Sequence, residues 1–265
     1  SPTFSGFRCC RLWRRIWMMR HGLRPLPWRR WGWQTAPMRV RMRWRGGGQC
    51  GLGGWMPELI TALRQAAPLG VVFAEGDATA PRWHGEALVA AVPKRLAEFA
   101  AGRNAARRAM AQLGLPPAAV PMQADRSPLW PTTVTGSISH CAGACIAAMA
   151  HARDYAGLGL DLEPVQPLTA DLWPLVLTTP ALARLPQDQP GLMALRVFCA
   201  KEAAYKAQYA VTGQLFDFQT LEVEVQGQNF VARFQHAVGR FGLGACLGGV
   251  LRQAAGIQAA LVWIA

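Results

Sequence analysis

The first 55 residues of this 265-residue chain contain no aspartate, glutamate or lysine, although twelve arginines lie there. Seven of the eleven tryptophans also fall in this segment, and no helical or strand period runs through it. No apolar run of the length that a secretory signal needs follows the basic residues. No stretch of the chain is long and apolar enough to span a bilayer. The sequence therefore gives no sign of export or of a membrane span.

The net charge of +13 is concentrated in this opening segment. The remaining chain holds 16 basic and 15 acidic residues, so it is close to neutral. An Arg- and Trp-rich segment can bind nucleic acid, lie on a membrane surface or act as a transit peptide. The same composition arises when GC-rich DNA is read outside the true frame, and ordinary helical composition begins at Met56. We therefore expect residues 1–55 to be a disordered or non-native extension.

The seven cysteines are odd in number and scattered along the chain. Without a secretory signal, this pattern indicates reduced thiols and a cytoplasmic protein. The histidines and cysteines between His140 and His151 match no common zinc-ligand spacing, and alternate residues of a strand face opposite ways. The sequence therefore predicts no zinc site.

Two carboxylates alternate with apolar residues in the segment Gly157–Glu163. On an extended strand, Asp161 and Glu163 project from one face, while Leu160 and Leu162 pack into the core on the other. A lone pair of acids in this pattern is usually a solvated strand face. Here the pair is enclosed by apolar residues and followed by a proline, which indicates a strand end, where sites are often built.

A second motif places Glu202 and Lys206 at positions i and i+4, which are neighbours on one face of a helix. A lone motif of this kind is most often an ion-pair ladder on a helix surface. Together with Asp161 and Glu163, however, it supplies three acids and a lysine. Such a set suits a hard divalent cation and a phosphate, because Mg²⁺ binds carboxylates and fills its other positions with waters and phosphate oxygens.

Four sequence blocks carry a family resemblance. Residues 157–163 (GLGLDLE) and 198–206 (FCAKEAAYK) are preceded by Trp-Pro at 130–131, by 136–141 (GSISHC) and by the basic pattern within 94–107. In this order the blocks resemble those of the 4′-phosphopantetheinyl transferases, in the enterobactin-type and surfactin-type branch. The resemblance covers roughly residues 93–206.

The resemblance implies an α+β fold of two similar halves related by a pseudo-twofold, with the active site in the cleft between them. The halves would be residues 56–156 and 157–265, the second carrying the metal site. It also implies transfer of the 4′-phosphopantetheine group of coenzyme A to a serine of an apo carrier protein, which is an acyl, peptidyl or aryl carrier. Adenosine 3′,5′-bisphosphate would be released. By analogy the enzyme would be a monomer that serves siderophore, polyketide or non-ribosomal peptide synthesis.

For the chemistry, the resemblance implies that Asp161, Glu163 and Glu202 hold Mg²⁺ on the pyrophosphate. Glu202, or a water, would take the serine proton. Lys206 would stabilise or protonate the leaving group, and Lys201 would support the pyrophosphate.

For coenzyme A, the resemblance implies that Arg95, Arg103 and Arg126 bind the 3′-phosphate. A guanidinium group suits this because it grips a phosphate in a bidentate fork. Ser139 and His140 would also bind the cofactor. Without the resemblance, the helix arginines would be interpreted as solvated charges and His140 as a satisfied core histidine.

Two other functions stay open. A nucleic-acid-binding protein would use the basic opening segment, and its binding would depend steeply on salt. The other alternative is a module that binds carrier proteins but has lost catalysis.

The sequence also predicts secondary structure: helices over 57–67, 84–113 and 191–210, and strands over 70–75, 144–150, 157–163, 221–225, 230–234 and 256–264.

Overall fold

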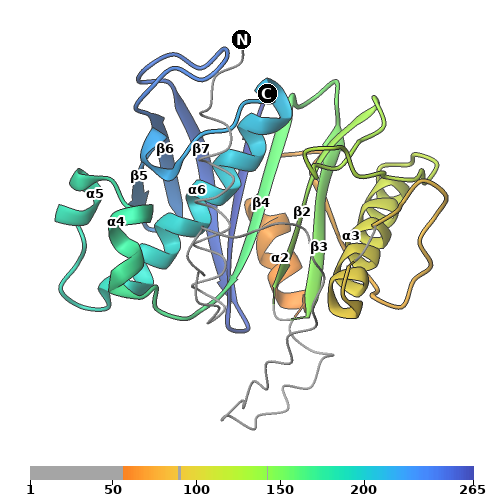
Figure 1. The fold of residues 1–265 in the computed structure, drawn as a ribbon, viewed down its shortest axis with the longest axis horizontal. Coiled ribbons are helices and arrows are strands. Elements are labelled where there is room, and N and C mark those ends of the chain that lie inside the picture. Colours follow the sequence, from red (N-terminus) through yellow and green to blue (C-terminus); the bar gives the residue numbers. More distant parts are fainter. Residues whose placement is uncertain (1–55, 89–90, 142) are drawn as a thin grey trace, which may run out of the picture. The chain divides into compact units, whose positions relative to one another are not determined.

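A computed structural model describes residues 56–88, 91–141 and 143–265 (Figure 1). The predicted extension over residues 1–55 lies outside these ranges. In chain order the elements are α2 (Met56–Ala66), β1 (Val72–Glu75), α3 (Pro93–Gln112), β2 (Val134–Cys141), β3 (Ala144–His151), β4 (Gly157–Pro164), η1 (Ala170–Leu172), α4 (Trp173–Val176), α5 (Thr179–Ala183), α6 (Pro190–Thr212), η2 (Phe218–Thr220), β5 (Leu221–Gln226), β6 (Asn229–Phe234), β7 (Cys246–Ala254) and β8 (Ile257–Ile264).

The strands form two antiparallel sheets, which confirms the α+β class. One sheet has the order β1-β3-β2 and the other the order β4-β8-β7-β6-β5. Helix α3 packs with the first sheet, and α6 runs along β4 of the second (Figure 1). The described residues belong to one compact unit, so the division into halves at residue 157 stays a prediction.

Serine hydroxyls join the two sheets where β2 lies beside β4 (Figure 1). The hydroxyl of Ser137 accepts a hydrogen bond from the Leu160 amide at 2.9 Å, and that of Ser139 accepts one from the Leu162 amide at 3.1 Å. These side chains thus satisfy strand amides of β4 on the side that faces β2. The β4 strand is thereby fixed between its backbone partner β8 and the serines of β2.

Strand β4 has two different faces, as its alternating sequence predicts. Leu160 and Leu162 are buried in a hydrophobic cluster with residues of α2, β7 and β8. On the opposite face, α6 packs so closely that a Cβ atom added to Gly159 would lie 1.8 Å from the carbonyl oxygen of Ala203. The carboxylates of β4 therefore project on the side of α6.

The predicted helix over 84–113 is wrong at its start. Helix α3 begins at Pro93, whose missing N–H is tolerated in a first turn. The preceding Val92 is extended, as a residue before proline prefers to be. The helix ends before Gly114, whose φ of +71° favours glycine.

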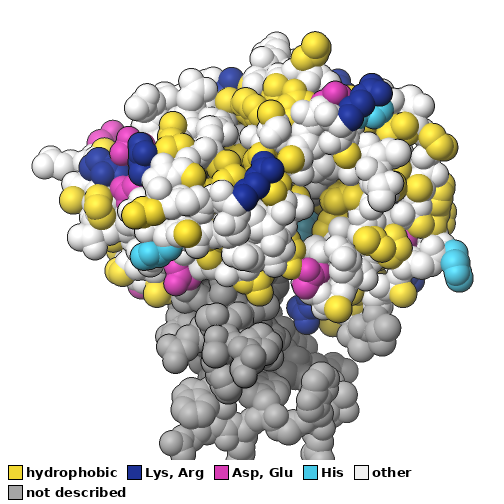
Figure 2. All heavy atoms as spheres, turned by 90° about the horizontal axis from the view of Figure 1, so that it is seen from above, with side chains coloured by type: hydrophobic (Ala, Val, Ile, Leu, Met, Phe, Trp, Pro, Cys, Tyr) yellow, Lys and Arg dark blue, Asp and Glu magenta, His cyan; other side chains and the backbone are white. Residues whose placement is uncertain are grey.

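Strands β2 and β7 were not predicted, and in β7 two glycines interrupt the apolar pattern. The predicted strands are present with shifted ends, and the helices over 57–67 and 191–210 correspond to α2 and α6. No helix among the described residues is long and apolar enough to cross a membrane. On the face drawn in Figure 2, basic side chains are separated by apolar and acidic ones and do not form a continuous patch.

Candidate active site

Three elements bring Ser139, Asp161 and Lys206 together. The Lys206 ammonium on α6 donates to Asp161 Oδ1 at 2.8 Å, to the Leu160 carbonyl at 2.9 Å and to Ser139 Oγ at 3.5 Å. Ser139 on β2 donates its own proton to Asp161 Oδ1 at 3.3 Å. The close packing of α6 on β4 brings these groups within reach. Predicted site residues from both sheets therefore share one hydrogen-bonded cluster.

Electrostatics keep Lys206 charged in this cluster. Burial lowers the pKa of the ammonium, but the carboxylates of Asp161 and Glu202 outweigh burial, and the pKa lies above its usual value. Asp161 is 5% exposed, and its Oδ2 is buried without a hydrogen-bond partner among the described residues. A buried carboxylate oxygen without a partner is costly, so this atom is suited to a further ligand.

Glu163 and Glu202 lie near the cluster but do not form a closed ligand set with Asp161. Both side chains are half-buried. Among the residues that the structure describes, no group of three or more His, Cys, Asp or Glu side chains is arranged to hold a metal ion. The predicted three-carboxylate site is therefore not gathered in this structure, although Asp161 and Glu163 share a strand face.

A second cluster lies where α3 meets the end of β2. Glu98 Oε2 accepts from Arg95 Nη1 at 3.3 Å and lies 3.4 Å from His140 Nε2. The hydrogen bond from His140 is the main reason why the pKa of the Glu98 carboxyl falls to about 2. Arg95 and His140 are exposed, with 49% and 38% of their side chains accessible. Two predicted phosphate ligands thus lie side by side, held by Glu98, a carboxylate that no predicted motif includes in the site.

Two α3 arginines are buried rather than solvated. Arg103 Nε donates to the Val120 carbonyl at 2.7 Å, its guanidinium lies 4.1 Å from the centre of the Phe99 ring, and burial lowers its pKa to about 10. The η nitrogens of Arg103 have no hydrogen-bond acceptor among the described residues. Arg107 binds both carboxylate oxygens of the buried Glu86, at 2.5 and 2.6 Å. This ion pair joins residues 21 positions apart, so no local pattern could have indicated it.

Lys201 lies away from the cluster, although it belongs to the same helix. The residue is 1% exposed, and its ammonium donates to the carbonyls of Val176 at 2.7 Å and Phe218 at 2.6 Å. Burial lowers its pKa to about 7, against the opposite effect of Glu222 and Asp217. The structure does not place Lys201 where it was expected to support a pyrophosphate. It holds α4 and η2 against α6.

Ser139 differs from expectation, whereas Arg126 is placed as a phosphate ligand would be. A hydroxyl has one proton to donate, and that of Ser139 is used by Asp161, which leaves none for a phosphate oxygen. Arg126 is exposed, and its side chain has no partner among the described residues. It therefore stays available for an anion.

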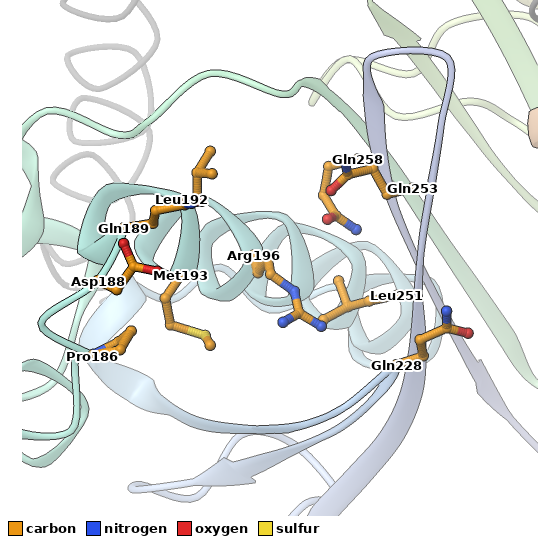
Figure 3. A pocket seen from close by; sticks show the side chains of 10 residues that line it. All are labelled: Pro186, Asp188, Gln189, Leu192, Met193, Arg196, Gln228, Leu251, Gln253 and Gln258. Carbon is orange, nitrogen blue, oxygen red and sulfur yellow. The ribbon is translucent and has the colours of Figure 1, made fainter.

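A cavity of about 430 Å³ lies beside the first turns of α6 (Figure 3). Its wall includes Met193 and Arg196 of α6 and the glutamines at 253 and 258. None of the predicted site residues lines this cavity. Gln258 is paired with Glu163 in the β4–β8 register, so the cavity begins one strand from the carboxylate.

Two family models match this chain in succession. The 4′-phosphopantetheinyl transferase N-terminal domain matches residues 84–150, and the 4′-phosphopantetheinyl transferase superfamily matches residues 157–241. The chain belongs to the 4′-phosphopantetheinyl transferase superfamily. All predicted site residues of this superfamily member lie inside the matched ranges, whereas residues 1–55 lie outside them.

Several curated relatives of the superfamily are similar to this chain. The 4′-phosphopantetheinyl transferase Svp of Streptomyces mobaraensis is 40% identical over 169 residues, which is 60% of this chain and 63% of that protein. The 4′-phosphopantetheinyl transferase Npt of Nocardia iowensis is 37% identical over 50% of this chain and 62% of its own length. Enterobactin synthase component D of Salmonella typhi is 38% identical over 47% and 53%. The chain thus spans less than two thirds of each of these relatives.

Proposed function

We propose that this chain transfers the 4′-phosphopantetheine group of coenzyme A to a serine hydroxyl of an apo carrier protein. The serine oxygen forms a bond to the phosphorus on the pantetheine side, the bond from that phosphorus to the bridging oxygen breaks, and the serine proton is released. Adenosine 3′,5′-bisphosphate leaves. The observation that carries the proposal is the succession of two family matches with every proposed catalytic residue inside them.

Lys206 and Glu202 are the proposed acid and base. The raised pKa of Lys206 favours a protonated ammonium at neutral pH, and such a group stabilises or protonates a leaving phosphate. Glu202 precedes it by four residues on α6, so the two groups lie on one helix face. Glu202, or a water, would accept the proton of the serine.

The proposed binding of a divalent cation rests on Asp161. The buried Oδ2 of Asp161 has no partner among the described residues, and a carboxylate oxygen is a ligand that Mg²⁺ prefers. Asp161 would hold the ion with Glu163 and Glu202. When bound, Mg²⁺ would neutralise charge that builds up on the pyrophosphate.

Arg95, His140, Arg103 and Arg126 are the proposed ligands of the coenzyme A phosphates. Arg95 and His140 are exposed and adjacent, and the η nitrogens of Arg103 remain for a ligand. Ser139 would orient Asp161 through its hydrogen bond, and Lys201 would stabilise the packing of α6 against α4 and η2.

The proposed partner is an acyl, peptidyl or aryl carrier protein of siderophore, polyketide or non-ribosomal peptide synthesis. We propose a monomer that works in the cytoplasm, a compartment favoured by the free cysteines at 141, 145, 199 and 246. The alternative function, binding of nucleic acid, would use residues 1–55. These residues lie outside the described ranges, and the family matches do not reach them.

The test is intact mass spectrometry of a purified apo carrier protein after incubation with this chain and coenzyme A. We expect a gain equal to one phosphopantetheine group that requires Mg²⁺, disappears with EDTA and returns when Mg²⁺ is added back. Asp161→Ala should abolish the gain and keep the fold, as judged by circular dichroism. Coenzyme A binding without any gain on several carriers would instead support a binding module, and no binding would overturn the proposed function.

A further inference from the structure

Residues 121–129 form a small hairpin before β2. The Gln123 amide donates to the Ser127 carbonyl at 2.9 Å, and the Arg126 amide donates to the Gln123 carbonyl at 2.9 Å. The three residues 124–126 form its tip. Met122 and Pro128 pair as an isolated antiparallel bridge below the tip.

Arg126 occupies an unusual place in this tip. Its φ is +74°, whereas three-residue hairpin loops usually place glycine at the left-handed position. A residue other than glycine costs about 1 kcal/mol there. Backbone strain of this kind is often found at functional positions. An exposed guanidinium kept at such a position is therefore a candidate ligand for an anion.

Asp125, beside it, connects the tip to α6. Its Oδ1 accepts from the Ser127 amide at 2.9 Å and from the Ser127 hydroxyl at 2.7 Å, and its Oδ2 accepts from the Tyr209 hydroxyl. Burial raises the pKa of Asp125, but the bonds from Tyr209 and Ser127 outweigh it and lower the pKa. Burial and the Asp125 carboxylate raise the pKa of Tyr209 to about 12. The tyrosine thus stays a donor, and the aspartate an acceptor, throughout the neutral pH range.

Tyr209 belongs to the same face of α6 as the proposed catalytic groups. Glu202, Lys206 and Tyr209 are spaced at i, i+4 and i+7, which is one stripe of a helix. Tyr209 follows Lys206 by three residues, a rise of about 4.5 Å along the axis. Its ring stacks on Tyr205 with centroids 5.9 Å apart, and the Tyr205 ring meets Phe216 edge-on. The tyrosine is therefore held at a fixed place relative to Lys206.

We propose that Tyr209 is a positioning residue that acts through Asp125 to hold Arg126 at a set distance from Lys206. The distance between these two cationic groups would then match the distance between the 3′-phosphate and the pyrophosphate of coenzyme A. This would make the 3′-phosphate a determinant of specificity. The proposal rests on the proposed function, because it needs both phosphates to bind.

The experiment compares Tyr209→Phe with a matched control, Tyr155→Phe. Tyr155 also donates its hydroxyl to a protein acceptor, the Leu69 carbonyl at 2.7 Å, but it is not part of the proposed site. Calorimetry measures the affinities for adenosine 3′,5′-bisphosphate and for adenosine 5′-monophosphate. Carrier-protein assays measure KM and kcat with coenzyme A and with 3′-dephospho-coenzyme A.

Tyr209→Phe should weaken bisphosphate binding and raise the KM for coenzyme A about five- to tenfold, the effect of one hydrogen bond. Affinity for the monophosphate, KM for dephospho-coenzyme A and kcat should stay within about twofold. Arg126→Ala should remove the same discrimination, and the double variant Arg126→Ala/Tyr209→Phe should lose no more than Arg126→Ala alone.

The outcomes distinguish failure of the positioning role of Tyr209 from failure of the proposed function. The positioning role would be overturned if Tyr209→Phe kept the wild-type preference for the bisphosphate over the monophosphate, or if it lost affinity equally for both. Transfer by the wild type would still uphold the proposed function in that case. A wild type that neither transfers the group nor binds the bisphosphate would overturn the proposed function, and with it this inference.

Discussion

Lys206 Nζ lies 2.8 Å from Asp161 Oδ1, while the second oxygen of the same carboxylate is buried and without a partner among the described residues. The ion pair is unequal in exposure, since 28% of the lysine side chain and 7% of the aspartate side chain are accessible. Asp161 therefore has two tasks. It neutralises Lys206, and in the proposed function its second oxygen would bind the cation.

Asp161→Asn should impair both tasks, and activity and stability report on them separately. We expect kcat/KM to fall on the order of a thousandfold, because a group that positions charge at the reacting phosphate is lost. The free energy of unfolding should fall by about 2 kcal/mol, less than for a fully buried pair because Lys206 is partly exposed. Asp154→Asn, which alters an exposed ion pair with Arg153, is the control and should change neither quantity. Urea unfolding and carrier-protein assays provide both readouts.

The double variant Asp161→Asn/Lys206→Met sharpens this test. It removes the unpaired ammonium, so stability should partly recover while activity stays low. Recovery of activity together with stability would contradict a catalytic role for either residue.

Lys201→Met should reduce stability and leave coenzyme A recognition unchanged. The carbonyls of Val176 and Phe218 lose their donor, which should cost about 1–3 kcal/mol of unfolding free energy. The KM for coenzyme A should change by less than about twofold, because Lys201 is 1% exposed and its ammonium is bound to carbonyls of α4 and η2. Lys94→Met, at an exposed lysine of α3, is the matched control. A tenfold rise in KM at unchanged stability would instead place Lys201 in the coenzyme A site.

The difference in unfolding free energy between the wild type and Lys201→Met should depend on pH in a defined direction. The pKa of Lys201 is lowered from 10.5 to about 7, so the unfolded chain binds more protons than the folded chain between these values. The stability of the wild type relative to Lys201→Met should therefore rise as the pH increases from about 7 to 10.5. A difference that stays constant over this window would contradict the buried position of the ammonium.

The sequence predicted the parts of the fold that repeat a local period. The alternation around Asp161 and Glu163 correctly placed the leucines of β4 in the core, and the pattern over 191–210 correctly gave α6. The helix over 84–113 was extended too far, because the composition before Pro93 resembles a helix and the proline restricts only its direct neighbour.

Contacts between residues far apart in the chain could not be predicted from the sequence. The Tyr209–Asp125 bond joins positions 84 residues apart, and the Arg107–Glu86 pair is formed by a loop and a helix with no shared motif. The contacts of Lys201 could not be predicted either, although this residue belongs to a recognised motif. Its spacing from Lys206 predicts a place on α6, but the carbonyls that bind it come from α4 and η2, which no local pattern identifies.

The approach of α6 to β4 predicts that Gly159 cannot be replaced. A Cβ atom there would lie 1.8 Å from the Ala203 carbonyl oxygen, which is backbone and cannot rotate away. Gly159→Ala should therefore destabilise the fold by about 3 kcal/mol or prevent folding. Gly248→Ala is the matched control, because a Cβ atom at that strand position meets nothing within 4 Å. Equal thermal stability of the two variants would contradict the close packing that forms the Asp161–Lys206 site.

The Glu98 cluster predicts an acid-sensitive contribution to stability. The hydrogen bond from His140, with help from Arg95, lowers the pKa of Glu98 from 4.5 to about 2. A carboxyl with a lowered pKa stabilises the fold above the unfolded value and loses this effect as the pH falls towards the folded value. The stability advantage of the wild type over Glu98→Gln should thus be complete above pH 4.5 and vanish near pH 2. Urea unfolding across this range measures it, and in a His140→Asn background the advantage should be much smaller. An advantage that does not depend on pH, or on His140, would show that Glu98 acts by packing alone and does not hold the proposed phosphate ligands together.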